Sequence, residues 1–143
     1  MARTPLELPT QFPFSTELPI YMSHINQGQH LDNVQMLTLV METRQRFFAW
    51  LGFPNAVDIG GLMLAAGEML VQYKAEAFYG ETMRVRMAVG ELGRCSVDLP
   101  YVMEDVASGR LICQGKVSMV FMDLASRRAA PVPPVFRERV AQL

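Results

Sequence analysis

The residues best suited to chemistry lie in one short loop, which holds both histidines of the protein, His24 and His30. Near neutral pH an imidazole can take a proton from water or hydrogen-bond to a carbonyl group. His30 comes just before an expected helix start, where backbone N–H groups lack partners inside the helix. Each histidine also has a structural alternative: His30 could fix the loop through backbone hydrogen bonds, and His24 continues the apolar face of the strand before it.

Polar side chains beside the histidines could assist them. Asn26 and Asn33 carry amides that can orient water or a carbonyl group, although turn formation and helix capping are the structural alternatives. Asp32 is the only carboxylate in the loop, and its position also suits an N-cap, with Gln35 completing a capping-box-like pair. Gly28 gives the loop backbone conformational freedom.

Two charged residues of the following helix stand out. Glu42 lies on its polar stripe and could serve as a base toward water, or pair with Arg46 four residues later or with a strand. Arg44 falls on the apolar face, where an unpaired guanidinium is costly. We therefore expect Arg44 to have a carboxylate or carbonyl partner, or to reach a wet edge.

Other kinds of site find little support. Two histidines without a third ligand make a weak metal site, and Ser23 lacks the setting of a nucleophile elbow. A formal net charge of −1 gives no reason to expect nucleic acid as a partner, and no apolar run is long enough to span a membrane. Cys95 and Cys113 lie in apolar alternating segments, which indicates small core residues in a reduced, cytoplasmic protein, although facing strands could let them oxidise.

The elements that must position the loop follow from hydrophobic periodicity. Residues 33–51 contain no Gly or Pro and predict one long, strongly apolar helix, which Gly52 and Pro54 stop. Its wide apolar face comprises Leu37, Val40, Met41, Phe47, Phe48 and Leu51. Residues 1–15 predict an extended arm, and residues 125–143 a proline-rich tail that ends in one or two helical turns.

Period-two alternation predicts the strands. They are expected over residues 17–23, 68–77, 82–89, 95–104 and 111–123, with the second and third joined around Tyr79 and Gly80. No second helix is long enough to cover the sheet, so one curved antiparallel sheet of about five strands must wrap around the single long helix. The expected fold class is α+β, with one domain over residues 1–143.

The order and spacing of these features resemble the hotdog-fold acyl-CoA thioesterases, in the branch related to 4-hydroxybenzoyl-CoA thioesterase and plant acyl-ACP thioesterases. The family's loop, turn, H-V-N-N and E-A-R motifs are matched by His24-Ile25-Asn26, Gly28, His30-Leu31-Asp32-Asn33 and Glu42-Thr43-Arg44. Its Y-x-x-E/P-x-x-x-G-D/E hairpin is similar to Tyr73, Glu76, Gly80 and Glu81, and its proline-bearing ending to Ser126–Pro134.

The resemblance implies hydrolysis of an acyl-CoA or acyl-ACP thioester, with no cofactor beyond the coenzyme A of the substrate. Where the family often carries its catalytic aspartate, this chain has His24, and it has Asn26 at the second acidic position. The implied base is therefore a loop histidine, His30 or His24, with Asn26 orienting the water and Glu42 as a further candidate. The family also implies a homodimer or homotetramer with active sites at a subunit boundary.

Substrate binding is expected at the helix start and on the neighbouring strands, by Gly28, Asn33, Tyr73 and Arg84. Free N–H groups at the start of the helix would stabilise the oxyanion, and methionine and aromatic walls would hold the acyl group. The coenzyme A diphosphate would meet Lys74, Arg84 or Arg86.

Two alternatives remain open at this point. One is a hotdog hydratase or dehydratase that acts on enoyl- or hydroxyacyl-CoA, and the other is a non-catalytic protein that binds acyl thioesters.

Overall fold

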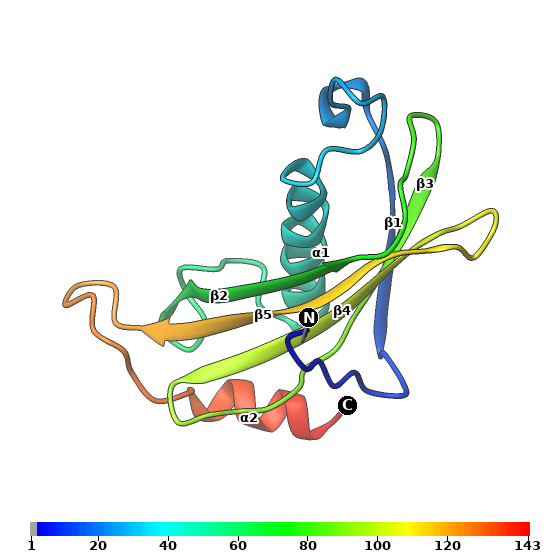
Figure 1. Cartoon of the computed structure of the whole chain (residues 1–143). Coiled ribbons are helices and arrows are strands. Elements are labelled where there is room, and N and C mark those ends of the chain that lie inside the picture. The colour runs from blue at the N-terminus through cyan, green and yellow to red at the C-terminus, as the bar shows by residue number, and fades with distance from the viewer. Residues whose placement is uncertain (1–2) are drawn as a thin grey trace.

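The protein forms one curved antiparallel sheet with a long helix against one face (Figure 1). The structure is a computed structural model and describes residues 3–143. Its strands are β1 (Phe14–Pro19), β2 (Met63–Tyr73), β3 (Thr82–Met87), β4 (Ser96–Asp105) and β5 (Leu111–Met122). Its helices are α1 (Gln35–Leu51), α2 (Pro134–Ala141) and a short 3-10 helix, η1 (Met22–His24). The predicted α+β hotdog architecture, a five-stranded sheet around one apolar helix, is confirmed.

The strand order is β1-β3-β4-β5-β2, so β2 and β3 do not pair. The two strands are joined through Tyr79 and Gly80 as predicted, but they do not form the hairpin that the family resemblance implied. β2 starts earlier, at Met63, and pairs with β5, whereas β3 pairs with β1 and β4. Because Lys74 and Ala75 both donate N–H bonds to the Ile112 carbonyl, the chain leaves the edge of the sheet there. We call residues 74–81, which join β2 to β3, the crossover segment.

The first strand also differs from its prediction over residues 17–23. It runs from Phe14 to Pro19, and its ladder with β3 extends from the Phe14–Met87 pair to the Pro19–Thr82 pair. Pro19 has no N–H to continue a ladder, and the chain coils into η1 soon afterwards. The N-terminal arm therefore ends at residue 13, and residues 1–2 of the predicted arm lie outside the described residues.

Helix α1 buries a face that is rotated slightly from the predicted one. Leu37 and Met41 are only half-buried, and Met36 and Leu39 take their places in the core. The buried side chains of α1 are Met36, Leu39, Val40, Thr43, Phe47, Phe48 and Leu51. The helix stops as predicted, because Gly52 adopts a left-handed φ of 103° and its N–H caps the last turn.

The predicted helical turns of the tail form α2. Its Phe136 ring is fully buried, 5.6 Å from the Phe48 ring and 5.2 Å from the Phe121 ring. Figure 1 shows α2 at one end of the molecule, while η1, the loop after it and the crossover segment lie at the opposite end, beside the start of α1. The packing of α2 therefore closes one end of the core. The loop that holds His24 and His30, called the histidine loop below, lies at the other end.

Candidate active site

The loop between η1 and α1 closes into a narrow hairpin that brings its polar residues together. The Asn26 N–H donates to the His30 carbonyl at 3.1 Å, and the Asp32 N–H donates to the His24 carbonyl at 2.9 Å. Gln29 turns the chain with a left-handed φ of 66°. Asn26 and His30 therefore face one another across the hairpin.

Gly28 has a different role from the one expected. The left-handed residue of the turn is Gln29, so the small size of Gly28 matters for close approach of its neighbours and not for its φ angle. A Cβ atom on Gly28 would lie 3.1 Å from His30 Nε2 and 3.2 Å from Asn26 Oδ1. The Gly28 N–H donates to Asn26 Oδ1 at 2.9 Å, so the Asn26 amide mainly fixes the turn beside the imidazole.

The tautomer of His30 follows from the hydrogen bond that its imidazole makes with Leu31. His30 Nδ1 lies 2.9 Å from the Leu31 carbonyl oxygen. A carbonyl can only accept, so Nδ1 must carry the proton and donate it. The neutral imidazole is therefore left with an unprotonated Nε2, which is the atom that a general base needs.

His30 lines a pocket of about 270 Å³ between the start of α1 and the end of β2. Tyr73 also lines this pocket, and its hydroxyl donates to the Asn33 carbonyl at 2.9 Å. Of the predicted site residues, the pocket brings together His30, Asn33 and Tyr73. Its other lining residues are Leu31, Met36, Lys74, Ala75 and Glu76.

Asp32 acts as the cap of α1. Its Oδ2 accepts hydrogen bonds from the N–H groups of Val34 at 2.9 Å and Gln35 at 3.1 Å. The Gln35 N–H, then the Val34 N–H and more weakly the Asn26 side chain, hold the pKa of Asp32 below its ordinary value. The expected row of free N–H groups at the helix start is therefore reduced: among the described residues of this turn, the Asn33 N–H is the one that donates no hydrogen bond.

His24 lies on the other side of the helix start. Its Nδ1 accepts the Tyr21 N–H at 3.1 Å, and it lines a pocket of about 290 Å³ together with Glu42 and Arg46. Glu42 pairs with Arg46 Nε at 2.9 Å, as its structural alternative predicted. The structure therefore does not bring His24 or Glu42 into the pocket of His30.

Arg84 lies away from the pocket, and Arg44, which is half-buried, has no carboxylate or carbonyl partner within the described residues. Arg84 lies on the sheet face opposite α1 and pairs with Glu17 at 3.1 Å, away from the pocket. Arg44 Nη1 lies 3.9 Å from the Met119 sulfur, and within the described chain the buried Nε of Arg44 has no acceptor. Burial lowers the pKa of Arg44. The expected carboxylate or carbonyl partner of Arg44 is therefore not found within residues 3–143.

Sequence reasoning missed most of the crossover segment as a wall of the site. Lys74, Ala75 and Glu76 line the pocket, and the Ala77 carbonyl accepts the Leu31 N–H at 2.7 Å. The signals for this wall were the spacing of Tyr73 and Glu76 and the positive charge of Lys74. The alternation of apolar and polar residues predicted that the strand continues to Ala77. Ala77 is indeed fully buried, but it lies beyond the end of β2.

Two further findings concern metal binding and membrane insertion. Within residues 3–143, no three His, Cys, Asp or Glu side chains gather closely enough to hold a metal ion. Over the same range, no helix combines the length and the apolar character that crossing a membrane would require.

Comparison with known families agrees with the fold. The sequence pattern of the thioesterase-like superfamily matches residues 21–140, so the chain belongs to this superfamily. The predicted family, and with it the prediction of a thioesterase-type enzyme, is confirmed at that level. A search of curated protein sequences finds no match.

Solved structures share the same fold. A 1,4-dihydroxy-2-naphthoyl-CoA thioesterase from Synechocystis superposes with a TM-score of 0.82 at 17% identity, covering 91% of this chain and 96% of its own. A thioesterase from Thermus thermophilus, solved with coenzyme A and Zn, gives 0.78 at 23% identity, covering 91% and 98%. A hypothetical protein from Staphylococcus aureus, solved with CoA, gives 0.82 at 16% identity, covering 96% and 87%.

Proposed function

We propose that this protein hydrolyses an acyl-CoA thioester to a free acid and coenzyme A, with His30 as the general base. The observation that carries the proposal is the hydrogen bond from His30 Nδ1 to the Leu31 carbonyl, which leaves Nε2 unprotonated in a residue that lines the pocket. In the first step Nε2 takes a proton from water, and the water oxygen bonds to the thioester carbon. In the second step the carbon–sulfur bond breaks, and the imidazolium returns the proton to the sulfur.

Neighbouring groups of the loop support the charges that form in these steps. The Asn33 N–H is available to donate to the carbonyl oxygen as it becomes negative. The carboxylate of Asp32 lies close enough to His30 for their charges to interact. Asn26 holds the turn through Gly28 and contacts Asp32, so its role is to position the two groups.

Coenzyme A is the proposed carrier and belongs to the substrate, so no separate cofactor is required. Lys74 lies on the rim of the pocket and can neutralise a phosphate, whereas Arg84 lies on the opposite sheet face. Two proteins of the same fold were solved with coenzyme A. Acyl-ACP is the alternative carrier, and competition between acyl-CoA and acyl-ACP in one assay distinguishes the two.

We extend the proposal to a cytoplasmic homodimer or homotetramer. β2 is an edge strand, so one side of its backbone is unpaired, and its Met69 and Tyr73 side chains are exposed. A shallow apolar groove of about 460 Å³ runs along α1 past Leu37 and Met41. Light scattering coupled to size exclusion tests this part, and a monomer at assay concentration contradicts it.

The test of the reaction is release of free thiol across a panel of acyl-CoA substrates. His30→Ala should lower kcat by about 100-fold or more, as expected for loss of a general base. His24→Ala is the matched control and should leave kcat within about twofold, because His24 lies outside the pocket of His30. The proposal is wrong if the wild type releases no thiol from any substrate, or if His30→Ala is fully active.

The same samples test the two alternatives. Loss of enoyl absorbance without thiol release would identify a hydratase. Saturable binding of acyl-CoA with no product after long incubation would identify a binding protein.

A further inference from the structure

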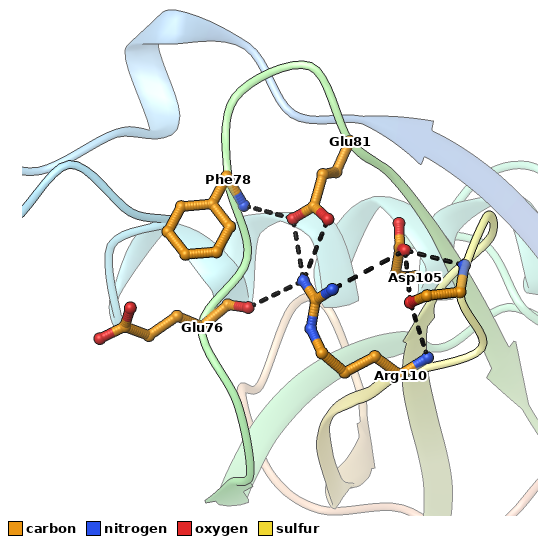
Figure 2. Close-up of polar contacts among 6 residues, drawn as sticks. Glu76, Phe78, Glu81, Asp105 and Arg110 are labelled. Atoms are coloured by element: carbon orange, nitrogen blue, oxygen red, sulfur yellow. Dashed lines mark hydrogen bonds and ion pairs between the residues drawn. The ribbon is translucent and has the colours of Figure 1, made fainter.

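Arg110 binds the crossover segment (Figure 2) and is not among the residues that line the pocket of His30. It lies in the connection between β4 and β5, and its Nη2 donates to both carboxylate oxygens of Glu81, at 2.9 and 3.0 Å. The same nitrogen lies 3.0 Å from the Glu76 carbonyl oxygen. One guanidinium therefore holds the crossover segment at two points, near its start and at its end.

The guanidinium is itself held in place by the turn that precedes it. Asp105 is buried, and its Oδ2 accepts the Ser108 hydroxyl at 2.6 Å and the Ser108 N–H at 3.0 Å. The Ser108 hydroxyl oxygen accepts the Arg110 N–H at 3.1 Å, and Arg110 Nη1 lies 3.9 Å from Asp105 Oδ2. The Ser108 hydroxyl bond lowers the pKa of Asp105, so this carboxylate stays charged beside Arg110.

The crossover segment connects this turn to the histidine loop. Two successive carbonyl groups of the segment bind the two neighbours. The Glu76 carbonyl accepts from Arg110, and the Ala77 carbonyl accepts the Leu31 N–H of the histidine loop at 2.7 Å. Leu31 also supplies the carbonyl that orients the His30 imidazole. At the far end, the Glu81 carbonyl accepts the Ile20 N–H at 3.1 Å, just before η1.

Glu81 also shapes the segment internally. Its Oε1 accepts the Phe78 N–H at 2.7 Å, so the carboxylate bound by Arg110 closes the bend of the crossover segment. A charge-assisted bond from a guanidinium is stronger and more directional than a neutral one. Removing the guanidinium would release the Glu76 carbonyl and the Glu81 carboxylate together.

We propose that Arg110, acting through Glu81 and the Glu76 carbonyl, is a positioning residue that sets the distance between the pocket wall and His30. The inference rests on the proposed function for its kinetic part and extends it to a residue outside the pocket. An error in the placement of reacting groups lowers the rate of the chemical step, whereas a purely stabilising contact leaves kcat per folded molecule unchanged.

Three variants of the full-length protein test the proposal. Arg110→Met removes the charge at similar length, Arg110→Lys keeps the charge but loses the planar guanidinium, and Glu81→Gln keeps the shape of the partner. Arg137→Met is the matched control, because Arg137 also donates to a backbone carbonyl, that of Gly93 at 3.0 Å, but from α2 at the other end of the molecule. Measurements are made well below the melting temperature of each variant.

Two readouts are needed. The first is kcat and KM for the best acyl-CoA, per folded molecule: Arg110→Met and Glu81→Gln should lower kcat about tenfold with little change in KM, and Arg110→Lys should fall between them and the wild type. The second is hydrogen exchange of the Leu31 amide, which should accelerate about tenfold in Arg110→Met but not in Arg137→Met.

The outcomes separate this inference from the proposed function. Wild-type kcat or wild-type Leu31 exchange in both Arg110→Met and Glu81→Gln overturns the positioning role. If the wild type hydrolyses no acyl-CoA, the proposed function fails, and the exchange measurement then decides the positioning of the histidine loop without any assay of activity.

Discussion

The Tyr73 hydroxyl donates a 2.9 Å hydrogen bond to the Asn33 carbonyl, which joins the last residue of β2 to the turn that starts α1. Both residues line the pocket of His30. The end of β2 and the start of α1, which are far apart in the sequence, therefore define the width of the pocket. They are joined there by one hydrogen bond, from the Tyr73 hydroxyl.

Tyr73→Phe should let the end of β2 move relative to the start of α1 and so change the width of the pocket. Loss of one partly exposed hydrogen bond should cost about 0.5–1 kcal/mol of folding free energy and raise KM for acyl-CoA by about threefold. Thermal melts and steady-state kinetics check both effects. Tyr79→Phe is the control, since Tyr79 is exposed and makes no hydrogen bond through its hydroxyl in the described chain. An unchanged KM in Tyr73→Phe would show that the bond does not set the pocket width.

Gly28→Ala should displace the His30 imidazole. The new Cβ would lie 3.1 Å from Nε2 and 3.2 Å from Asn26 Oδ1, and one of the two side chains must move. We expect kcat to fall about tenfold, because small displacements of a catalytic base are costly. Gln29→Gly in the same turn should stay within about twofold of wild type, since glycine accepts the left-handed φ of 66°. Full activity in Gly28→Ala would argue against His30 as the base.

Arg44→Met should stabilise the isolated chain. Arg44 is half-buried, its Nε has no acceptor within the described residues, and its Nη1 contacts the Met119 thioether at 3.9 Å. Replacing an uncompensated charge by an apolar chain of similar length should add about 1 kcal/mol to the free energy of unfolding. Urea denaturation measures it. A destabilised Arg44→Met that also shifts the oligomeric state would instead place the acceptor of Arg44 on a second copy of the chain.

Asp32→Asn should weaken the start of α1 in a pH-dependent way. The N–H groups of Gln35 and Val34 hold the pKa of Asp32 below 3.8, so the folded state binds this proton less tightly than the unfolded state does. The ionised carboxylate therefore stabilises the fold above about pH 4, and this contribution is lost as the pH falls through the lowered pKa. Melting temperatures of both proteins between pH 7 and pH 3 should converge at the acid end. A constant difference across that range would exclude the charge of Asp32 as the cause.

Several features could be predicted from the sequence because they depend on neighbours along the chain. The long helix follows from the absence of Gly and Pro between Asn33 and Leu51, and its end from Gly52. The position of His30 just before the start of this helix also follows from neighbours along the chain, because Asp32 is a residue type that caps helices. The end of β1 was also readable, because Pro19 has no N–H to continue a ladder, whereas the end of β2 was not, because Ala77 is buried by packing outside any strand.

The sequence by itself determined one apolar helix, a sheet of alternating strands and a histidine loop between them, because hydrophobic period and turn chemistry act over a few residues. Only the tertiary structure decided that β2 pairs with β5, that His30 and His24 lie in different pockets, and that Arg110 holds Glu81 across 29 positions of sequence. These features depend on contacts between distant segments, and the energies of such contacts are set by the packing of the whole sheet around α1.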